Sequence, residues 1–206
     1  MIDNYGALTL GRYMRVNAVL ESEDEELDKQ VQIIAILADM TPDEVLLLPI
    51  GDYARMAAQT AFLREHCKPT EIGDGWHLDE LRPVTDFRRI NTAQYIDFQT
   101  FAKGFPASLP QLLSVFLVPE GKAYNDGYDV AEVQHRVEDI PFPDALGLAA
   151  FFLGRFLQLT EDSLTSWGEA LRKEKDARKR TEIRTRIAEV QALLQHAGDG
   201  SLTWTE

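Results

Sequence analysis

Cysteine, histidine and long apolar runs are scarce in this 206-residue sequence, and each scarcity excludes a class of protein. The single cysteine, Cys67, cannot form an internal disulfide, which favours a reducing, intracellular setting. The most apolar stretch, residues 145–159, is interrupted by Arg155 and is too short for a membrane span. The N-terminus lacks a basic segment followed by an apolar one, so we expect no signal peptide. Together these features predict a soluble protein of the cytoplasm.

Motifs of the common enzyme and cofactor-binding classes are also missing. The chain has no glycine-rich phosphate-binding loop and no Gly-x-Ser-x-Gly nucleophile motif. His66, Cys67 and His77 could supply metal ligands, but their spacing matches no zinc-binding pattern. The acidic run of residues 21–26 lacks the alternation of a calcium loop. We therefore expect no cofactor, no metal and no enzymatic activity.

Charge is distributed unevenly along the sequence. The chain holds 34 acidic and 21 basic residues, a net charge of −13. Residues 172–186 carry eight basic residues against three acidic ones, a net of +5, which leaves −18 on the rest of the chain. The basic residues of this segment are Arg172, Lys173, Lys175, Arg178, Lys179, Arg180, Arg184 and Arg186.

This basic segment has two interpretations. One is a solvated helix with intrahelical ion pairs. The other is a docking surface for an acidic partner or for the acidic body of a neighbouring copy. The acidic remainder of the chain argues against nucleic acid as the partner, because phosphate would be repelled.

The pattern of apolar residues predicts a mainly α fold. With 45% hydrophobic residues the chain can bury a core, and most apolar positions recur at helical spacing. Turn residues at 71–75, followed by Trp76 and Leu78, favour a short β-hairpin. We expect a compact helical domain with a small β-hairpin element and a long C-terminal helix. The expected segments are an N-terminal helical unit at 1–67, a β-hairpin insertion at 68–91, a helical core at 92–160, a charged C-terminal helix at 161–200 and a tail at 201–206.

Helix caps give the most specific local predictions. Thr9 is placed to cap a first helix, and Thr41 with Glu44 three residues later forms a capping-box pattern around Pro42. Pro49 should end that helix about two turns later. Further helices are expected from about Asp52, from Asn91 or Thr92, from Ser108, from Val130, from Asp144 and from about Asp162.

Two other features allow both a functional and a structural interpretation. Tyr124 and Tyr128 could stack on a ligand, but we favour a place at the edge of the core with both hydroxyls in water. Apolar residues from Ile183 to Leu194 recur at spacings of four, three and four, like a short coiled-coil seam. That seam could pack on the protein's own body or on another copy.

Two stretches of the sequence resemble small proteins from the tail modules of tailed phages and prophages. The first runs from Leu8-Thr9-Leu10-Gly11-Arg12-Tyr13, through residues 31–40, to the capped segment 41–50. The second comprises residues 92–99 and 115–129. The resemblance covers residues 8–160 and is to tail assembly chaperones and related tail proteins. The basic C-terminal segment has no counterpart in it.

The resemblance implies a binding protein and transfers no catalytic residue. A tail assembly chaperone holds the hydrophobic tape measure chain soluble in the host-cell cytoplasm while the tail tube polymerises. For this chain it implies a protein partner, the tape measure protein or another tail protein, and no membrane, and it leaves homo-oligomerisation open. A structural virion component or adaptor is the alternative, and a small-ligand binder or an enzyme without a recognisable motif is the second alternative.

Overall fold

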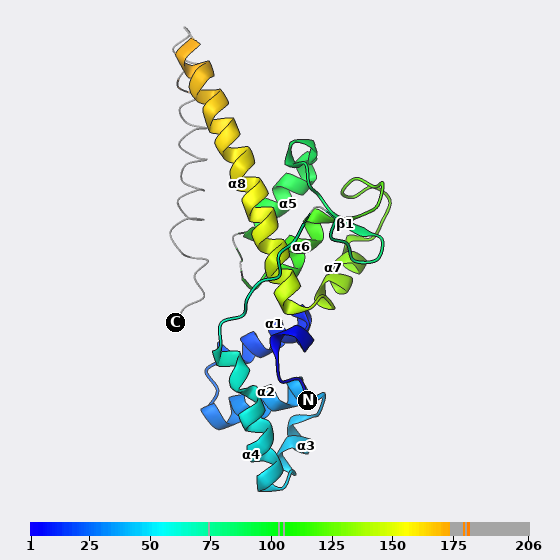
Figure 1. Cartoon of the computed structure of the whole chain (residues 1–206), viewed down its shortest axis with the longest axis vertical. Helices are drawn as coiled ribbons and strands as arrows, with labels where there is room; N and C mark the ends of the chain where they lie inside the picture. Colours follow the sequence, from blue (N-terminus) through cyan, green and yellow to red (C-terminus); the bar gives the residue numbers. More distant parts are fainter. Residues whose placement is uncertain (74, 103, 105, 174–178, 180, 182–206) are drawn as a thin grey trace. The chain divides into compact units, whose positions relative to one another are not determined.

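The computed structural model describes residues 1–73, 75–102, 104, 106–173, 179 and 181 (Figure 1). Most of the ordered elements in this part of the chain are helices, and its sheet has two short strands. The prediction of a mainly α fold with a small β element is confirmed. The chain divides into two compact units. Unit 1 comprises residues 1–85 and 90–151, and unit 2 includes residues 86–89 and the described residues from Phe152 on.

The N-terminal part of unit 1 consists of short helices with the predicted caps. They are α1 (Leu10–Leu20), α2 (Glu26–Ala38), α3 (Pro42–Leu46) and α4 (Ile50–Gln59), and a 3-10 turn (Thr60–Arg64) follows α4. The Thr9 hydroxyl accepts the N–H of Arg12 at 3.4 Å. The Thr41 hydroxyl accepts the N–H of Glu44 at 3.2 Å, and the Glu44 carboxylate accepts the N–H of Thr41 at 2.7 Å. Both predicted caps are therefore confirmed.

Helix α2 is the centre of this part, because it contributes to two apolar clusters. Ile33 and Leu37, one turn apart, join a cluster with buried residues from the α1 region and the 3-10 turn. Val31 and Ile34 join a second cluster with Val45 of α3. A helix buried on both sides in this way fixes the positions of its neighbours on either side.

The second part of unit 1 is arranged around α6. Its elements are α5 (Thr92–Ala102), α6 (Leu109–Phe116), β2 (Leu117–Pro119), α7 (Val130–Glu138) and the first turns of α8 (Phe142–Lys173). Helix α6 is buried at every position except Gln111, and α5 and α7 pack against it. Asn91 caps α5 by accepting the N–H of Gln94 at 2.8 Å, as the sequence indicated.

The small sheet pairs strands that are distant in the sequence. Strand β1 (Leu81–Pro83) runs antiparallel to β2, with Leu81 opposite Pro119. Among the described residues of the expected hairpin region, Leu78 pairs with Leu81 around a two-residue turn. The partner of β1 therefore comes from the end of the buried helix α6, whose Phe116 carbonyl accepts the N–H of Val84 at 2.8 Å.

Helix α8 covers a region for which the sequence predicted two helices. It runs without a break from Phe142 to Lys173, so the helix starts expected at Asp144 and Asp162 belong to one element. No proline or glycine stands between Gly154 and Asp162, so nothing ends the first helix. The apolar seam from Ile183 to Leu194 lies outside the described residues.

A pair of backbone hydrogen bonds joins the two parts of unit 1. The N–H of Leu10 donates to the Ile140 carbonyl at 2.8 Å, and the N–H of Phe142 donates to the Leu8 carbonyl at 2.7 Å. Phe142 is 1% exposed, and its ring stacks on Tyr13 with 3.6 Å between the ring centroids. We call this contact the clasp.

The loop before β1 crosses α8 at a glycine. The Thr70 N–H donates to the Pro143 carbonyl at 2.9 Å, and its hydroxyl lies 2.6 Å from the Asp144 carboxylate. A Cβ atom on Gly147 would lie 2.0 Å from the Thr70 carbonyl oxygen. Only glycine allows the two backbones to approach this closely.

We expect Gly147→Ala to lower the free energy of unfolding by about 1–3 kcal/mol, because the added methyl group forces the crossing apart. Gly154→Ala in the same helix is the matched control, since a Cβ there has no neighbour within 4 Å. Its helix propensity should raise stability by about 0.5–1 kcal/mol. Urea unfolding followed by circular dichroism measures the free energy of unfolding of both variants. A change of the same sign in the two variants would contradict the close approach of Thr70 to Gly147.

Candidate interaction surface

Three of the eight basic residues predicted to bind a partner fall within the described part of the chain. Arg172 and Lys173 are the last two residues of α8, and Lys179 is an exposed helical residue. The other five lie outside the described residues: Lys175, Arg178, Arg180, Arg184 and Arg186. A partner-binding role for this segment stays a prediction.

The residues considered as metal ligands do not form a cluster. His66 and His77 are exposed, and Cys67 is half-buried with a pKa raised to about 11 by burial, so its thiol stays protonated near neutral pH. Among the described residues there is no group of three or more His, Cys, Asp or Glu side chains that could hold a metal ion.

Tyr124 belongs to the core, which corrects the expectation that its hydroxyl is in water. The residue is 6% exposed, and its hydroxyl donates to the Asp97 carboxylate of α5 at 2.8 Å. Burial, followed by this hydrogen bond, raises the pKa of Tyr124. The Tyr128 hydroxyl is also buried and makes no hydrogen bond of standard geometry with the described residues. Burial raises the pKa of Tyr128, and a contact with the Asn125 backbone partly offsets this rise.

These contacts fasten the loop after β2 onto α5. The Asn91 side chain donates to the Tyr124 carbonyl at 3.0 Å. Gln94, only 3% exposed, donates to the Val115 carbonyl of α6 at 2.8 Å. Helix α5 thus turns a polar face inward, where each group named here has a partner. This arrangement explains Tyr124 structurally and does not require a ligand there.

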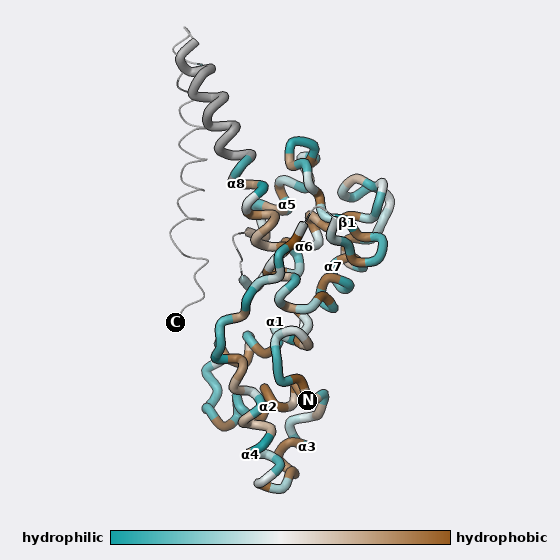
Figure 2. The backbone as a smooth tube through the Cα atoms, viewed as in Figure 1, coloured by the Kyte–Doolittle hydropathy of each residue, from teal (hydrophilic) through white to brown (hydrophobic). Residues whose placement is uncertain are grey.

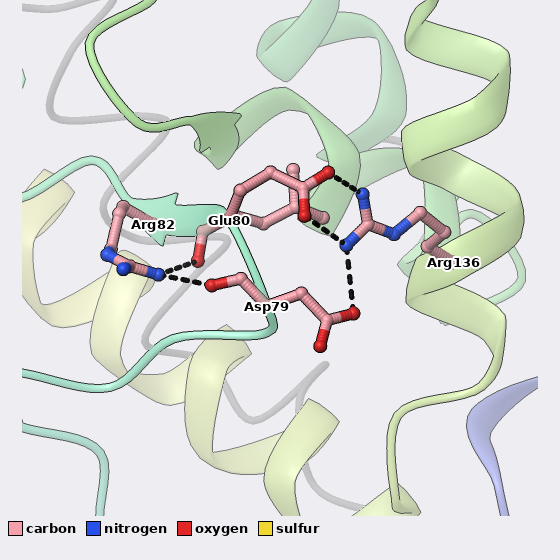
Figure 3. Close-up of polar contacts among 5 residues, drawn as sticks. Asp79, Glu80, Arg82 and Arg136 are labelled. Carbon is pink, nitrogen blue, oxygen red and sulfur yellow. Dashed lines mark hydrogen bonds and ion pairs between the residues drawn. The ribbon is translucent and has the colours of Figure 1, made fainter.

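Arg136 of α7 connects the turn before β1 to the helical part of unit 1 (Figure 3). Its guanidinium contacts both carboxylate oxygens of Glu80 and lies 3.0 Å from the Asp79 carboxylate. Arg82 extends the network to Glu120 of the loop after β2 at 3.1 Å. The hydrogen bond from Arg136 is the main reason that the pKa of Glu80 is lowered. The network holds loops in place and leaves no carboxylate pair poised for acid–base chemistry.

An open hollow lies where α1, α2 and the start of α3 meet. Its volume is about 190 Å³. It is lined by Arg15, Gln32, Ala35, Ile36, Asp39, Met40 and Pro42. Sites for drug-sized ligands usually enclose about 300–1,000 Å³. The hollow is therefore too small to support a small-ligand site of the usual kind.

The turn between α3 and α4 exposes three large apolar side chains. Leu46 is 65% exposed, Leu47 is 84% exposed and Ile50 is 82% exposed. Figure 2 shows this segment in brown, the hydrophobic end of the scale, where α3 meets α4. We call these three residues the apolar corner. Burial of such side chains on binding is favourable, so a cluster of them marks a candidate protein contact.

The corner is exposed because α3 is too short to bury all its apolar residues. The helix has five residues, and its inward position is occupied by Val45, which is 1% exposed. Leu48 turns back toward the same cluster and is half-buried. Pro49 then redirects the chain into α4. The capping box at Thr41 fixes the start of α3 five residues before the first residue of the corner.

Acidic residues surround the apolar corner in the sequence and in its helices. Asp43 and Glu44 stand in the first turn of α3, and Asp52 stands in the first turn of α4. Asp43 lies on the same helical face as Leu46 and Leu47, three and four residues later. Residues 21–59 hold ten acidic and two basic residues, a net charge of −8. Arg55 pairs with Asp52, so Asp43 and Glu44 carry the unbalanced negative charge beside the corner, which suits a partner that is both apolar and basic.

Sequence reasoning missed the corner although a signal was present. Residues 45–48 are four consecutive apolar residues between the capping box and Pro49. A helix of one or two turns can bury only one face, so part of this run had to be exposed.

Comparisons of the chain with protein-family models, with curated proteins and with solved structures found no match. Among the described helices, none combines the length and the apolar character that a bilayer span requires.

We expect Tyr124→Phe to lower the free energy of unfolding by about 1–3 kcal/mol, because the buried Asp97 contact loses its donor. Tyr128→Phe is the matched control: its hydroxyl makes no hydrogen bond of standard geometry and contacts only backbone at Asn125, so removing it should cost clearly less than removing the Tyr124 hydroxyl. Thermal and urea unfolding compare the two variants. An unchanged stability of Tyr124→Phe would show that Tyr124 acts only through the packing of its ring.

We expect Arg136→Met to raise the pKa of Glu80 toward its ordinary value of 4.5. A carboxylate with a lowered folded-state pKa stabilises the fold above its ordinary pKa and loses that contribution as the pH falls through the lowered value. The stability difference between the wild type and this variant should therefore be largest near neutral pH and shrink in acid.

NMR titration of the Glu80 side chain measures the pKa change, and urea unfolding at several pH values measures the stability difference. Arg55→Met, which removes the exposed ion pair with Asp52, is the control and should leave the Glu80 titration unchanged. An unchanged Glu80 pKa in Arg136→Met would contradict the network.

Proposed function

We propose that this chain is a non-enzymatic phage or prophage tail morphogenesis protein, an assembly chaperone that binds the tape measure protein in the host-cell cytoplasm. Two observations support the proposal. Segments within residues 8–160 resemble tail assembly chaperones. The apolar corner offers exposed apolar side chains on an acidic surface, and this observation carries the proposal.

The apolar corner suits weak, reversible binding to a helix. Full burial of a leucine or isoleucine side chain contributes about 1.5–3 kcal/mol, so three such residues contribute roughly 5–9 kcal/mol. Association costs about 4–15 kcal/mol in lost freedom. The two free energies are of similar size, so each corner would bind its partner weakly and release it readily. A chaperone needs such reversible contacts, because it must cover the apolar surface of the partner and later dissociate from it. An apolar stripe on a helix presents side chains at the spacing needed to contact such a surface.

The structural-component alternative makes a different prediction about the finished particle. A chaperone leaves before the tail is complete, whereas a virion component or adaptor stays. Mass spectrometry of purified particles distinguishes the two: the peptides of this chain should be missing if it is a chaperone. Their presence at stoichiometric amounts would favour the structural role.

We expect coexpression with the tape measure protein to give a soluble complex that copurifies. Leu47→Asp with Ile50→Asp should abolish copurification and return the tape measure protein to the insoluble fraction, because charge replaces the apolar contact. Ile96→Asp is the control, since Ile96 is an exposed apolar residue of α5, away from the corner in the sequence, with 55% exposure. If both variants copurify as well as the wild type, the corner is not the binding surface.

A further inference from the structure

The apolar corner and the basic segment of the same chain have complementary chemistry. The corner lies within residues 21–59, which carry a net charge of −8, and residues 172–186 carry +5. Apolar residues recur from Ile183 to Leu194, overlapping the end of the basic segment, at the spacing of one face of a helix. The two stretches are therefore complementary: exposed apolar side chains beside acidic residues in one, and basic residues followed by regularly spaced apolar residues in the other.

We propose that the apolar corner of one copy binds the segment 172–194 of a second copy. Opposite charges draw the two surfaces together, and the apolar residues are then removed from water. A second copy is the occupant that we propose, because every copy of the chain carries both the corner and the complementary segment. Within the described residues Leu46, Leu47 and Ile50 are the exposed apolar residues that stand beside Asp43, Glu44 and Asp52.

The contact joins two different surfaces, so it is heterologous. After two copies have joined, one corner and one segment are still unoccupied, and further copies can add at either end. The assembly therefore grows with protein concentration, as a chain or a closed ring. Salt weakens it, because the Debye length falls to about 3 Å at 1 M ionic strength.

Self-association does not depend on the proposed function, although it uses the same corner. It requires only the purified chain, whereas the chaperone role requires the tape measure protein. A partner helix bound at the corner would compete with the segment of a second copy. Failure of one experiment therefore leaves the result of the other standing.

The test uses four double variants of the full chain and one single variant. The corner variant is Leu47→Asp with Ile50→Asp, and its control is Ile96→Asp. The segment variant is Arg184→Glu with Arg186→Glu, and its control is Lys68→Glu with Lys122→Glu, which changes the net charge equally at two exposed positions. The fourth double variant, Leu47→Ser with Ile50→Ser, removes the apolar side chains without adding charge. Circular dichroism establishes that each is folded.

Sedimentation velocity measures the average mass of each protein from about 1 to 100 μM at low and high salt. We expect the mass of the wild type and both controls to rise with concentration, and high salt to weaken association at least ten-fold. The corner variants and the segment variant should each remain monomeric. A wild type that is monomeric at every concentration in low salt would overturn the proposal, because the segment then either binds within its own copy or serves another protein.

Mixing the corner variant with the segment variant identifies the geometry. Each retains the surface that the other lacks, so one contact can form, and the mixture should give a species of twice the monomer mass and nothing larger. A mixture that stays monomeric while the wild type associates would overturn the pairing of corner with segment, because each variant still carries one intact surface for the other. A segment variant that associates as strongly as its control would overturn it too.

Discussion

The stacking of Phe142 on Tyr13 is the contact on which the architecture of unit 1 depends. Phe142 is 1% exposed, and its backbone N–H donates a hydrogen bond to the Leu8 carbonyl. One residue therefore both packs against the N-terminal helices and fixes its backbone to the segment before α1. Burial of such a ring contributes about 1.5–3 kcal/mol, a large part of the net stability of roughly 5–15 kcal/mol that is usual for a domain. Burial also raises the pKa of Tyr13 to about 12, so its hydroxyl remains neutral inside the cluster.

The clasp and the capping box together explain how this chain can display apolar side chains without losing its fold. Helix α2 is buried on both sides and supports α3 from within, while the clasp ties the helices before it to α6–α8. The residues of the apolar corner are mostly exposed and belong to neither of the two clusters that α2 joins. A substitution there should therefore change the surface far more than the core, which makes the corner a suitable target for mutation.

The sequence predicted the features that depend on neighbouring residues and missed those that depend on distant ones. The caps at Thr9, Thr41 and Asn91 follow from side chains within three residues of the groups they bind. The pairing of Leu81 with Pro119 joins segments separated by 38 positions, and nothing in the local pattern indicates which strand is the partner. The sequence predicts Tyr124 at the edge of the core with its hydroxyl in water, because nothing near Tyr124 in the sequence indicates that Asp97 of α5 accepts its hydrogen bond. The uneven distribution of charge can be read from the sequence. The exposure of the corner could be predicted only once it was known that α3 has five residues.

The clasp also imposes an order on synthesis. Tyr13 precedes Phe142 by 129 residues, so at about 5–20 residues per second the growing chain needs roughly 6–26 s to deliver the ring that completes the cluster. During that interval the N-terminal helices expose Tyr13 and its neighbours to solvent, because the Phe142 ring that covers them is not yet made. A polypeptide cut short before Phe142 would keep that apolar surface exposed even though its helix caps could already form.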